Sequence, residues 1–264
     1  MLKEVTLGNT EAWTYHSKEM DDEYEIRVAL PKSPPPEEGY PIIYVLDGQS
    51  YFQFARDVIR LQSKNSAKTF VHEAIVVGIG HAGEDEDIRK RRFYDFTAPA
   101  KEYIYPERLK GFDVGKHGGA KKFLHFIEEE LKPRIEKRYI INKKKQALFG
   151  HSLSGLFTLW TLFTKPAAFQ TYLACSPSIW WNDYELFKYM EAFLQQKIEK
   201  IRIHITVGEY ERFMVDDAKR MAHELITKIP EAVLECEYYI APEENHASVV
   251  PTIMSRAIRF ACRS

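Results

Sequence analysis

Apolar and polar positions alternate near the start of the chain and then gather into short apolar runs. Residues 24–30 (YEIRVAL) alternate with a period of two, which predicts a half-buried strand. Residues 42–46 (IIYVL) and 73–79 (EAIVVGI) are continuous apolar runs, which are typical of central strands covered on both faces. The proline-rich residues 31–41 predict a loop between the first two of these strands.

Strand and helix patterns then alternate to the end of the chain. Further strands are expected at residues 146–149, 171–175, 201–207 and 233–240. Helical spacing is found at residues 123–139, with Pro133 at a kink or restart, and at 153–163, 184–198, 215–229 and the C-terminus. This order predicts an α/β fold over residues 1–264, with a mostly parallel central sheet, helices on both faces and an antiparallel N-terminal edge.

Residues 81–119 interrupt this alternation with charges, aromatic residues and glycines. The segment is long for a structureless connection inside a compact domain. We therefore expect a loop or cap-like insertion at about residues 81–119 of a single α/β domain.

Composition limits the classes of function. The chain has 264 residues, of which 45% are hydrophobic, and a formal net charge of −1, so a general electrostatic attraction to nucleic acid or to an anionic membrane is not expected. We see no signal peptide core and no run of about 18 apolar residues, and the three cysteines fit neither a disulfide framework nor a metal site. A cytoplasmic protein without a metal or organic cofactor is the expectation.

The most informative motif surrounds Ser152. Residues 147–157 (ALFGHSLSGLF) predict a strand, a sharp turn bearing Ser152 and a helix, which is the context of a nucleophile elbow. Small residues are needed two positions before and after the serine, and Gly150 and Ser154 stand there. The motif is thus G-x-S-x-S, with serine in place of the commoner second glycine. The alternative is a Ser/Gly-rich connection without chemistry.

A catalytic acid and base are expected after the serine in the chain order Ser, acid, His. Glu211 lies three residues past the glycine that ends the strand at 201–207, where hydrolases of this type usually carry the acid. Glu209 is a close rival, and Asp216 and Asp217 are more distant alternatives. Each could also be a solvated loop carboxylate.

His246 lies on the loop after the last predicted strand and is the expected base. One of its ring nitrogens would accept the proton of Ser152, and the other would donate to the acid. An oxyanion hole needs two backbone N–H groups, expected from Leu153 and from Gln49 or Gly48. For the latter two residues, an ordinary Asp-Gly turn is the alternative.

Five pieces of the chain together resemble the esterase family of α/β-hydrolases, in particular its branch of enterochelin and bacillibactin esterases, which open siderophore trilactones. The pieces are VLDGQSYF (45–52), RRFYDFTAP (91–99), FGHSLSGLF (149–157), SPSIWWND (176–183) and NHASVVP (245–251). The family also includes S-formylglutathione hydrolases, mycolyl transferases and feruloyl esterases. Some siderophore esterases of this branch resemble Ser-His dyads, so a dyad is an alternative to the triad.

Arg91, Arg92, Trp180 and Trp181 are the candidate substrate-binding residues, because cations and aromatic faces suit catecholate rings and their anionic iron chelate. A solvated basic face and a pair of core tryptophans are the alternatives. The leading hypothesis is a serine carboxylic ester hydrolase that cleaves the trilactone of a catecholate siderophore, with the iron belonging to the substrate. The alternatives are a general short-chain ester or thioester hydrolase, an acyl transferase and a non-catalytic binding protein.

Overall fold

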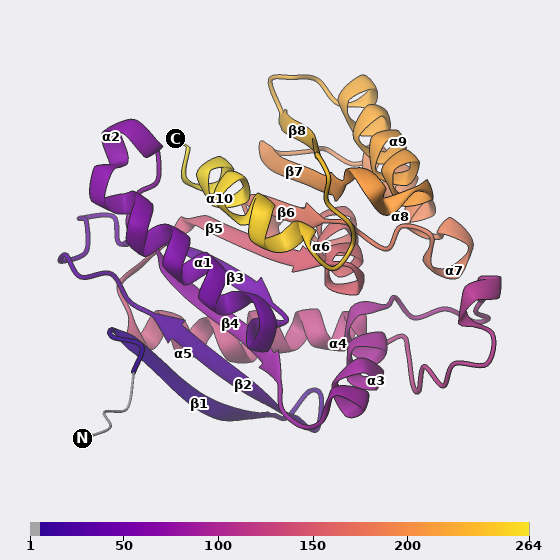
Figure 1. The fold of residues 1–264 in the computed structure, drawn as a ribbon, viewed down its shortest axis with the longest axis horizontal. Helices are drawn as coiled ribbons and strands as arrows, with labels where there is room; N and C mark the ends of the chain where they lie inside the picture. Colours follow the sequence, from indigo (N-terminus) through magenta and orange to yellow (C-terminus); the bar gives the residue numbers. More distant parts are fainter. Residues whose placement is uncertain (1–5, 264) are drawn as a thin grey trace.

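A computed structural model describes residues 6–263 and shows an eight-stranded sheet (Figure 1). The strand order is β1-β2-β4-β3-β5-β6-β7-β8. β1 and β2 pair antiparallel with each other and β2 with β4, and the other neighbours pair parallel. The strands are β1 Thr10–Ser17, β2 Asp22–Ala29, β3 Tyr40–Leu46, β4 Ile75–His81, β5 Ile141–His151, β6 Thr171–Cys175, β7 Ile201–Gly208 and β8 Leu234–Ala241. The predicted parallel sheet with an antiparallel N-terminal edge is confirmed.

Helices cover both faces of the sheet, and each face has its own apolar core. On one face, α1 (Gly48–Gln62) and α10 (Val249–Cys262) pack against Ile43, Val45 and Phe149. The larger core on the other face includes residues of α3 Asp85–Phe96, α4 Ala120–His125, α5 Lys132–Arg138, α6 Leu153–Thr164, α8 Leu186–Leu194 and α9 Phe213–Lys228. The short helices α2 (Ser66–Thr69) and α7 (Trp181–Tyr184) lie in connections.

The helix expected at residues 123–139 is interrupted. A π-helical turn, η3 (Phe126–Leu131), separates α4 from α5, and Pro133 is the second residue of α5. The carboxylate of Glu130 in this turn accepts hydrogen bonds from the hydroxyls of Tyr15 and Ser17. These hydrogen bonds attach the π-helical turn to the hairpin of β1 and β2.

The segment at residues 81–119 is partly helical. α3 occupies its first part, and Phe93 and Phe96 of this helix enter the larger core. A short 3₁₀ turn, η2 (Glu107–Leu109), follows within an otherwise irregular connection to α4. Within residues 6–263, no helix combines the length and apolar character required to cross a membrane.

The carboxyl ends of the parallel strands position the candidate functional residues. β3 ends just before Asp47, β5 just before Ser152, and β7 just before the turn η5 (Glu209–Glu211). β8 leads into the loop that carries His246. Because these strands are parallel, their ends lie at one edge of the sheet, where α/β proteins place their sites.

Candidate active site

Ser152 occupies a sharp turn between β5 and α6. Its backbone has φ 62° and ψ −117°, a sparsely populated conformation for a residue other than glycine. A Cβ on Gly150 would lie 2.1 Å from the carbonyl oxygen of Ser154, so the turn requires glycine at that position. The N–H of Ser152 donates to the carbonyl of Cys175 at the end of β6, 3.0 Å away. These contacts fix the turn against the neighbouring strand.

Ser152, His246 and Glu211 meet in one hydrogen-bonded chain. The Oγ of Ser152 is 3.0 Å from Nε2 of His246, and Nδ1 of His246 is 2.6 Å from Oε2 of Glu211. The rival Glu209 is exposed and accepts the N–H of Glu243 at 2.8 Å instead. The structure therefore brings Glu211, and not Glu209, to the imidazole.

The carboxylate of Glu211 is held by groups other than His246 as well. Its Oε1 accepts the hydroxyl of Ser176 at 2.5 Å and the N–H of Gly208 at 2.7 Å, and only 6% of the residue is exposed. Burial alone would raise the pKa of Glu211, but the hydrogen bonds from His246, Ser176 and Gly208 hold that pKa below its usual range. The acid is thus an ionised acceptor facing the ring N–H of His246.

Two helix N-termini follow the neighbouring strands β5 and β3 at the carboxyl edge of the sheet. Leu153 is the first residue of α6, and Gly48 and Gln49 are the first two residues of α1. Such N–H groups have no carbonyl one turn earlier within their own helix, so they remain available to an anion. A Cβ on Gly48 would lie 2.8 Å from the backbone of Gly78, so this close approach of α1 to β4 requires glycine.

The chain matches the family model described as "Putative esterase" over residues 17–249. It belongs to this esterase family. The ferri-bacillibactin esterase BesA of Bacillus subtilis (strain 168) is 40% identical over 262 residues, which cover 97% of this chain and 90% of that protein. A siderophore enterobactin esterase of Emericella nidulans is 30% identical over 287 residues, covering 96% of this chain and 93% of the relative.

A solved structure, that of the BES protein from Bacillus cereus, is similar to this esterase over nearly its whole length. The TM-score is 0.92 at 42% sequence identity, with 99% of this chain and 98% of the other covered. With the strand order above, this match confirms the α/β-hydrolase fold that the sequence predicts.

The two arginines expected to bind substrate are engaged elsewhere in this esterase. The guanidinium of Arg92 donates to both carboxylate oxygens of the buried Asp47, at 2.7 and 3.0 Å. Arg91 lies 2.9 Å from the carboxylate of Asp22 and donates to the carbonyl of Glu23 at 2.6 Å. These contacts hold both guanidinium groups against the fold, and the binding of substrate by Arg91 and Arg92 stays a prediction.

The tryptophan pair divides between core and surface. Trp181 is 1% exposed and packs against Phe93 and Tyr103, so its expected contact with substrate is corrected. Trp180 is half-buried, with its ring centroid 6.2 Å from that of Trp181. Of the two, only Trp180 keeps surface that a ligand could reach.

The sequence analysis missed two serines that contact the candidate triad. Ser176 donates to Glu211, and Oγ of Ser178 lies 3.3 Å from Oγ of Ser152. The N–H of Ser178 also donates to the carbonyl of Ser152 at 3.0 Å. Both serines follow β6, the strand beside β5, and this position at the carboxyl edge was the signal available in the sequence.

His151 is a further missed neighbour. Its ring is buried with its centroid 4.5 Å from that of His246, and its Nδ1 is 2.9 Å from the hydroxyl of Tyr51. Burial lowers the pKa of His151 to about 3, and the neighbouring His246 and Arg92 act in the same direction. An uncharged imidazole therefore flanks His246.

Proposed function

We propose that Ser152, His246 and Glu211 form the catalytic triad of a carboxylic ester hydrolase. The observation that carries this proposal is the continuous hydrogen-bonded chain from Oγ of Ser152 through both ring nitrogens of His246 to Glu211. A serine hydroxyl is a weak nucleophile until a neighbouring base takes its proton. His246 is placed for that transfer, and ionised Glu211 stabilises the imidazolium that results.

The reaction proceeds through an acyl-enzyme. Oγ of Ser152 forms a bond to the ester carbonyl carbon while its proton passes to Nε2 of His246. The negative oxygen that develops is stabilised by the N–H groups of Leu153 and of Gln49 or Gly48. The ester C–O bond then breaks, and His246 returns the proton to the leaving alkoxide. Water attacks the acyl group by the same route, releasing a carboxylic acid and regenerating Ser152.

The substrate that we propose is the trilactone of a catecholate siderophore. Support comes from two relatives, a ferri-bacillibactin esterase and a siderophore enterobactin esterase, each aligned over more than nine-tenths of this chain. Hydrolysis of the lactone esters removes the tether that holds the catecholate arms together, which weakens their grip on iron.

Aromatic and cationic side chains near the triad fit such a substrate. Tyr210 and Arg212 flank Glu211 in the chain, and both are exposed. Together with Trp180, they offer aromatic ring faces and a positive charge to catecholates. This is the substrate-binding role that the sequence analysis expected of Arg91 and Arg92.

A hydrolysis panel tests the proposal. It compares ferric and iron-free catecholate trilactones with S-formylglutathione and a short p-nitrophenyl ester, each with wild type and with Ser152→Ala. We expect the highest kcat/KM for a trilactone and no turnover above background for the variant. A preference for the small ester would leave a general esterase, and unchanged turnover by Ser152→Ala would reject the triad.

A further inference from the structure

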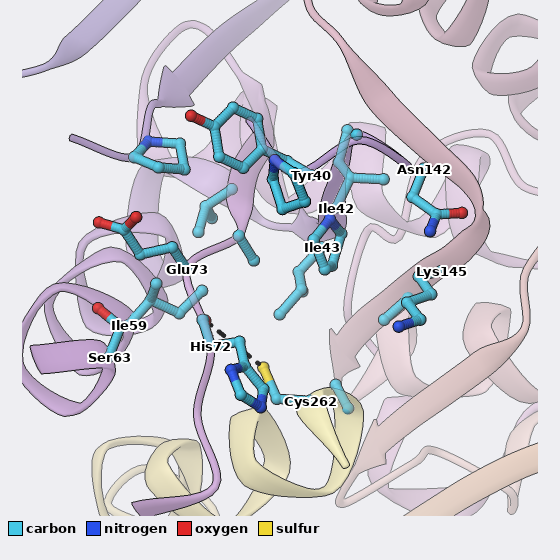
Figure 2. A pocket seen from close by; sticks show the side chains of 18 of the residues that line it. Tyr40, Ile42, Ile43, Ile59, Ser63, His72, Glu73, Asn142, Lys145 and Cys262 are labelled. Carbon is cyan, nitrogen blue, oxygen red and sulfur yellow. Dashed lines mark hydrogen bonds between the residues drawn. The ribbon is translucent and has the colours of Figure 1, made fainter. Parts of the chain in front are cut away.

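A groove of about 1030 Å³ lies at the amino ends of the parallel strands, away from the candidate active site. Figure 2 shows the side chains of Ile42 and Ile43 of β3 between His72 on one side and Lys145 on the other. Lys145 stands on a bulge of β5, where the register with β3 shifts. The described residues that line the groove include none of the candidate triad. The groups that can act on a bound ester therefore lie at the other edge of the sheet, around Oγ of Ser152.

The turn after β6 contacts the candidate triad at both ends. Ser176 begins this turn with φ 43°, and its hydroxyl donates to Oε1 of Glu211 at 2.5 Å. Two residues later, Oγ of Ser178 is 3.3 Å from Oγ of Ser152. A left-handed conformation at a residue other than glycine is uncommon and costs free energy. The surrounding contacts therefore hold the turn in a conformation that places one hydroxyl on the acid and one on the nucleophile.

Backbone contacts fix Ser178 beside the nucleophile. Its N–H donates to the carbonyl of Ser152 at 3.0 Å, and its own carbonyl accepts the N–H of Trp181, also at 3.0 Å. Gly155 of α6 lies against the same turn, since a Cβ on Gly155 would be 3.1 Å from Cα of Pro177. Only 1% of Ser178 is exposed. Its hydroxyl is therefore shielded from solvent and held in place before any substrate binds.

The protons available at the site set the direction of the contact between the two hydroxyls. Nδ1 of His246 carries the ring proton, because it faces the ionised carboxylate of Glu211, and Nε2 is then the acceptor of a neutral ring. Oγ of Ser152 gives its single proton to this Nε2 and can only accept from Ser178. Within residues 6–263, the hydroxyl of Ser178 has no other hydrogen-bond partner, so its proton is free for Ser152.

The strength of this hydrogen bond changes during the reaction. At 3.3 Å it is long for two neutral hydroxyls, which usually lie about 2.5–3.0 Å apart. A negative charge on the acceptor shortens such a bond to about 2.5–2.7 Å and roughly doubles its strength. Oγ of Ser152 gains negative charge when it leaves the acyl group, whereas in the acyl-enzyme it is an ester oxygen and a poor acceptor. The bond from Ser178 therefore strengthens most between the acyl-enzyme and the transition state of deacylation.

We propose that Ser178 is a further catalytic residue, whose hydroxyl donates to Oγ of Ser152 and stabilises that oxygen as the leaving group of deacylation. Water adds to the acyl carbon while His246 takes one of its protons. The bond between the acyl carbon and Oγ of Ser152 then breaks, the electron pair stays on Oγ, and His246 returns the proton to it. Ser178 keeps its own proton throughout. The inference rests on the proposed triad, because it assigns Ser178 to the same nucleophile.

Pre-steady-state kinetics with a p-nitrophenyl ester separate the two half-reactions, because p-nitrophenol is released on acylation. We expect Ser178→Ala to slow deacylation about 10- to 100-fold, since it loses a hydrogen bond to a charged oxygen. Acylation should slow by about threefold or less, because the bond to the neutral hydroxyl is weak. The acyl-enzyme should accumulate, so that a larger burst of p-nitrophenol than in wild type precedes a slower steady state. Unchanged deacylation, or equal slowing of both half-reactions, would overturn the proposal.

Two further variants separate the hydroxyl of Ser178 from the shape of the turn. Ser178→Thr keeps a hydroxyl and should deacylate within about fivefold of wild type. Deacylation as slow as in Ser178→Ala would assign the effect to packing and overturn the proposal. Ser176→Ala makes the same change at the acid end, and should slow both half-reactions by similar factors because Glu211 supports His246 in each. A selective loss of deacylation in Ser176→Ala would assign the effect to the turn as a whole, which also overturns the role of Ser178.

Ser152→Ala separates this inference from the proposed triad. The variant should release no burst of p-nitrophenol, because it cannot form the acyl-enzyme. A normal burst in Ser152→Ala would reject the triad itself. An inactive Ser152→Ala together with wild-type deacylation in Ser178→Ala would leave the triad in place and reject only the role of Ser178.

Discussion

Oγ of Ser154 donates a hydrogen bond to Oδ2 of Asp47 at 2.7 Å and accepts the N–H of His151 at 2.8 Å. The serine that replaces the second glycine of the common motif therefore joins the nucleophile turn to the loop that begins α1. Asp47 adopts φ 52° and directly precedes Gly48 and Gln49. This link fixes the positions of the backbone N–H groups of Leu153 and Gln49, the two proposed oxyanion donors, relative to each other.

Ser154→Ala should lower kcat by about 10- to 100-fold and change KM little, because displaced donors stabilise the transition state less well. It should also lower the free energy of unfolding by about 1–3 kcal/mol, since the N–H of His151 loses its buried acceptor. Steady-state kinetics and urea unfolding measure the two effects. Thr161→Val, which removes a buried hydroxyl on the same helix, is the control. Wild-type kcat in Ser154→Ala would show that the link does not position the site.

Glu211→Gln should reduce kcat by about 10²- to 10⁴-fold, because the amide no longer stabilises the imidazolium. Glu209→Gln makes the same chemical change two residues away, on a carboxylate that contacts Glu243 and not His246, and should leave kcat within about twofold of wild type. Single-turnover kinetics on both variants measure the difference. Full activity of Glu211→Gln would mean that Ser152 and His246 act as a dyad.

Arg92→Met should destabilise the protein by about 3–5 kcal/mol, because Asp47 would remain as a buried carboxylate without its cation. Adding Asp47→Asn should recover part of that loss. Arg138→Met removes an exposed partner of Glu11 and should change the free energy of unfolding far less than Arg92→Met does, because water screens an exposed ion pair. Urea unfolding gives all three values. If Arg92→Met instead keeps its stability and raises only KM for the trilactone, Arg92 contacts substrate and its assignment to the fold is wrong.

His151 should make stability fall with decreasing pH. Its pKa is about 3 in the folded protein, whereas a histidine in the unfolded chain titrates near about 6.5. Between these values the unfolded chain binds the extra proton, so stability rises with pH across this window and is lost as pH falls. His151→Asn should flatten the slope of unfolding free energy against pH by up to about 1.4 kcal/mol per unit.

Urea unfolding between pH 4 and pH 7 measures that slope. His223→Asn, at an exposed position on α9, controls for the loss of an imidazole. An unchanged slope in His151→Asn would contradict the account of a neutral, buried His151.

The sequence predicted the fold and the three residues that meet at the candidate site because their signals are local. A strand ending at Ser152, another ending before Glu211 and a loop bearing His246 are each readable from a few neighbouring residues. Parallel strands then bring these ends to one edge without further information. The spacing alone did not separate Glu211 from Glu209, because that choice depends on which carboxylate turns inward toward the imidazole.

The substrate-binding residues were less predictable because their partners are remote in the sequence. Arg92 is paired with Asp47, which lies 45 residues earlier in the chain, and no local sequence pattern indicates that the two residues pair. The full extent of β5 was also hidden, since the lysines at 143–145 interrupt its apolar run. A bulge removes the period of two on which strand prediction depends.

Labelling with a fluorophosphonate, followed by peptide mass spectrometry, tests the central claim most directly. This reagent reacts with a serine only where a base activates the hydroxyl. The account predicts one adduct, on Ser152, that forms much more slowly in His246→Ala and is absent in Ser152→Ala. An adduct on a different residue, or equal labelling of wild type and His246→Ala, would contradict it.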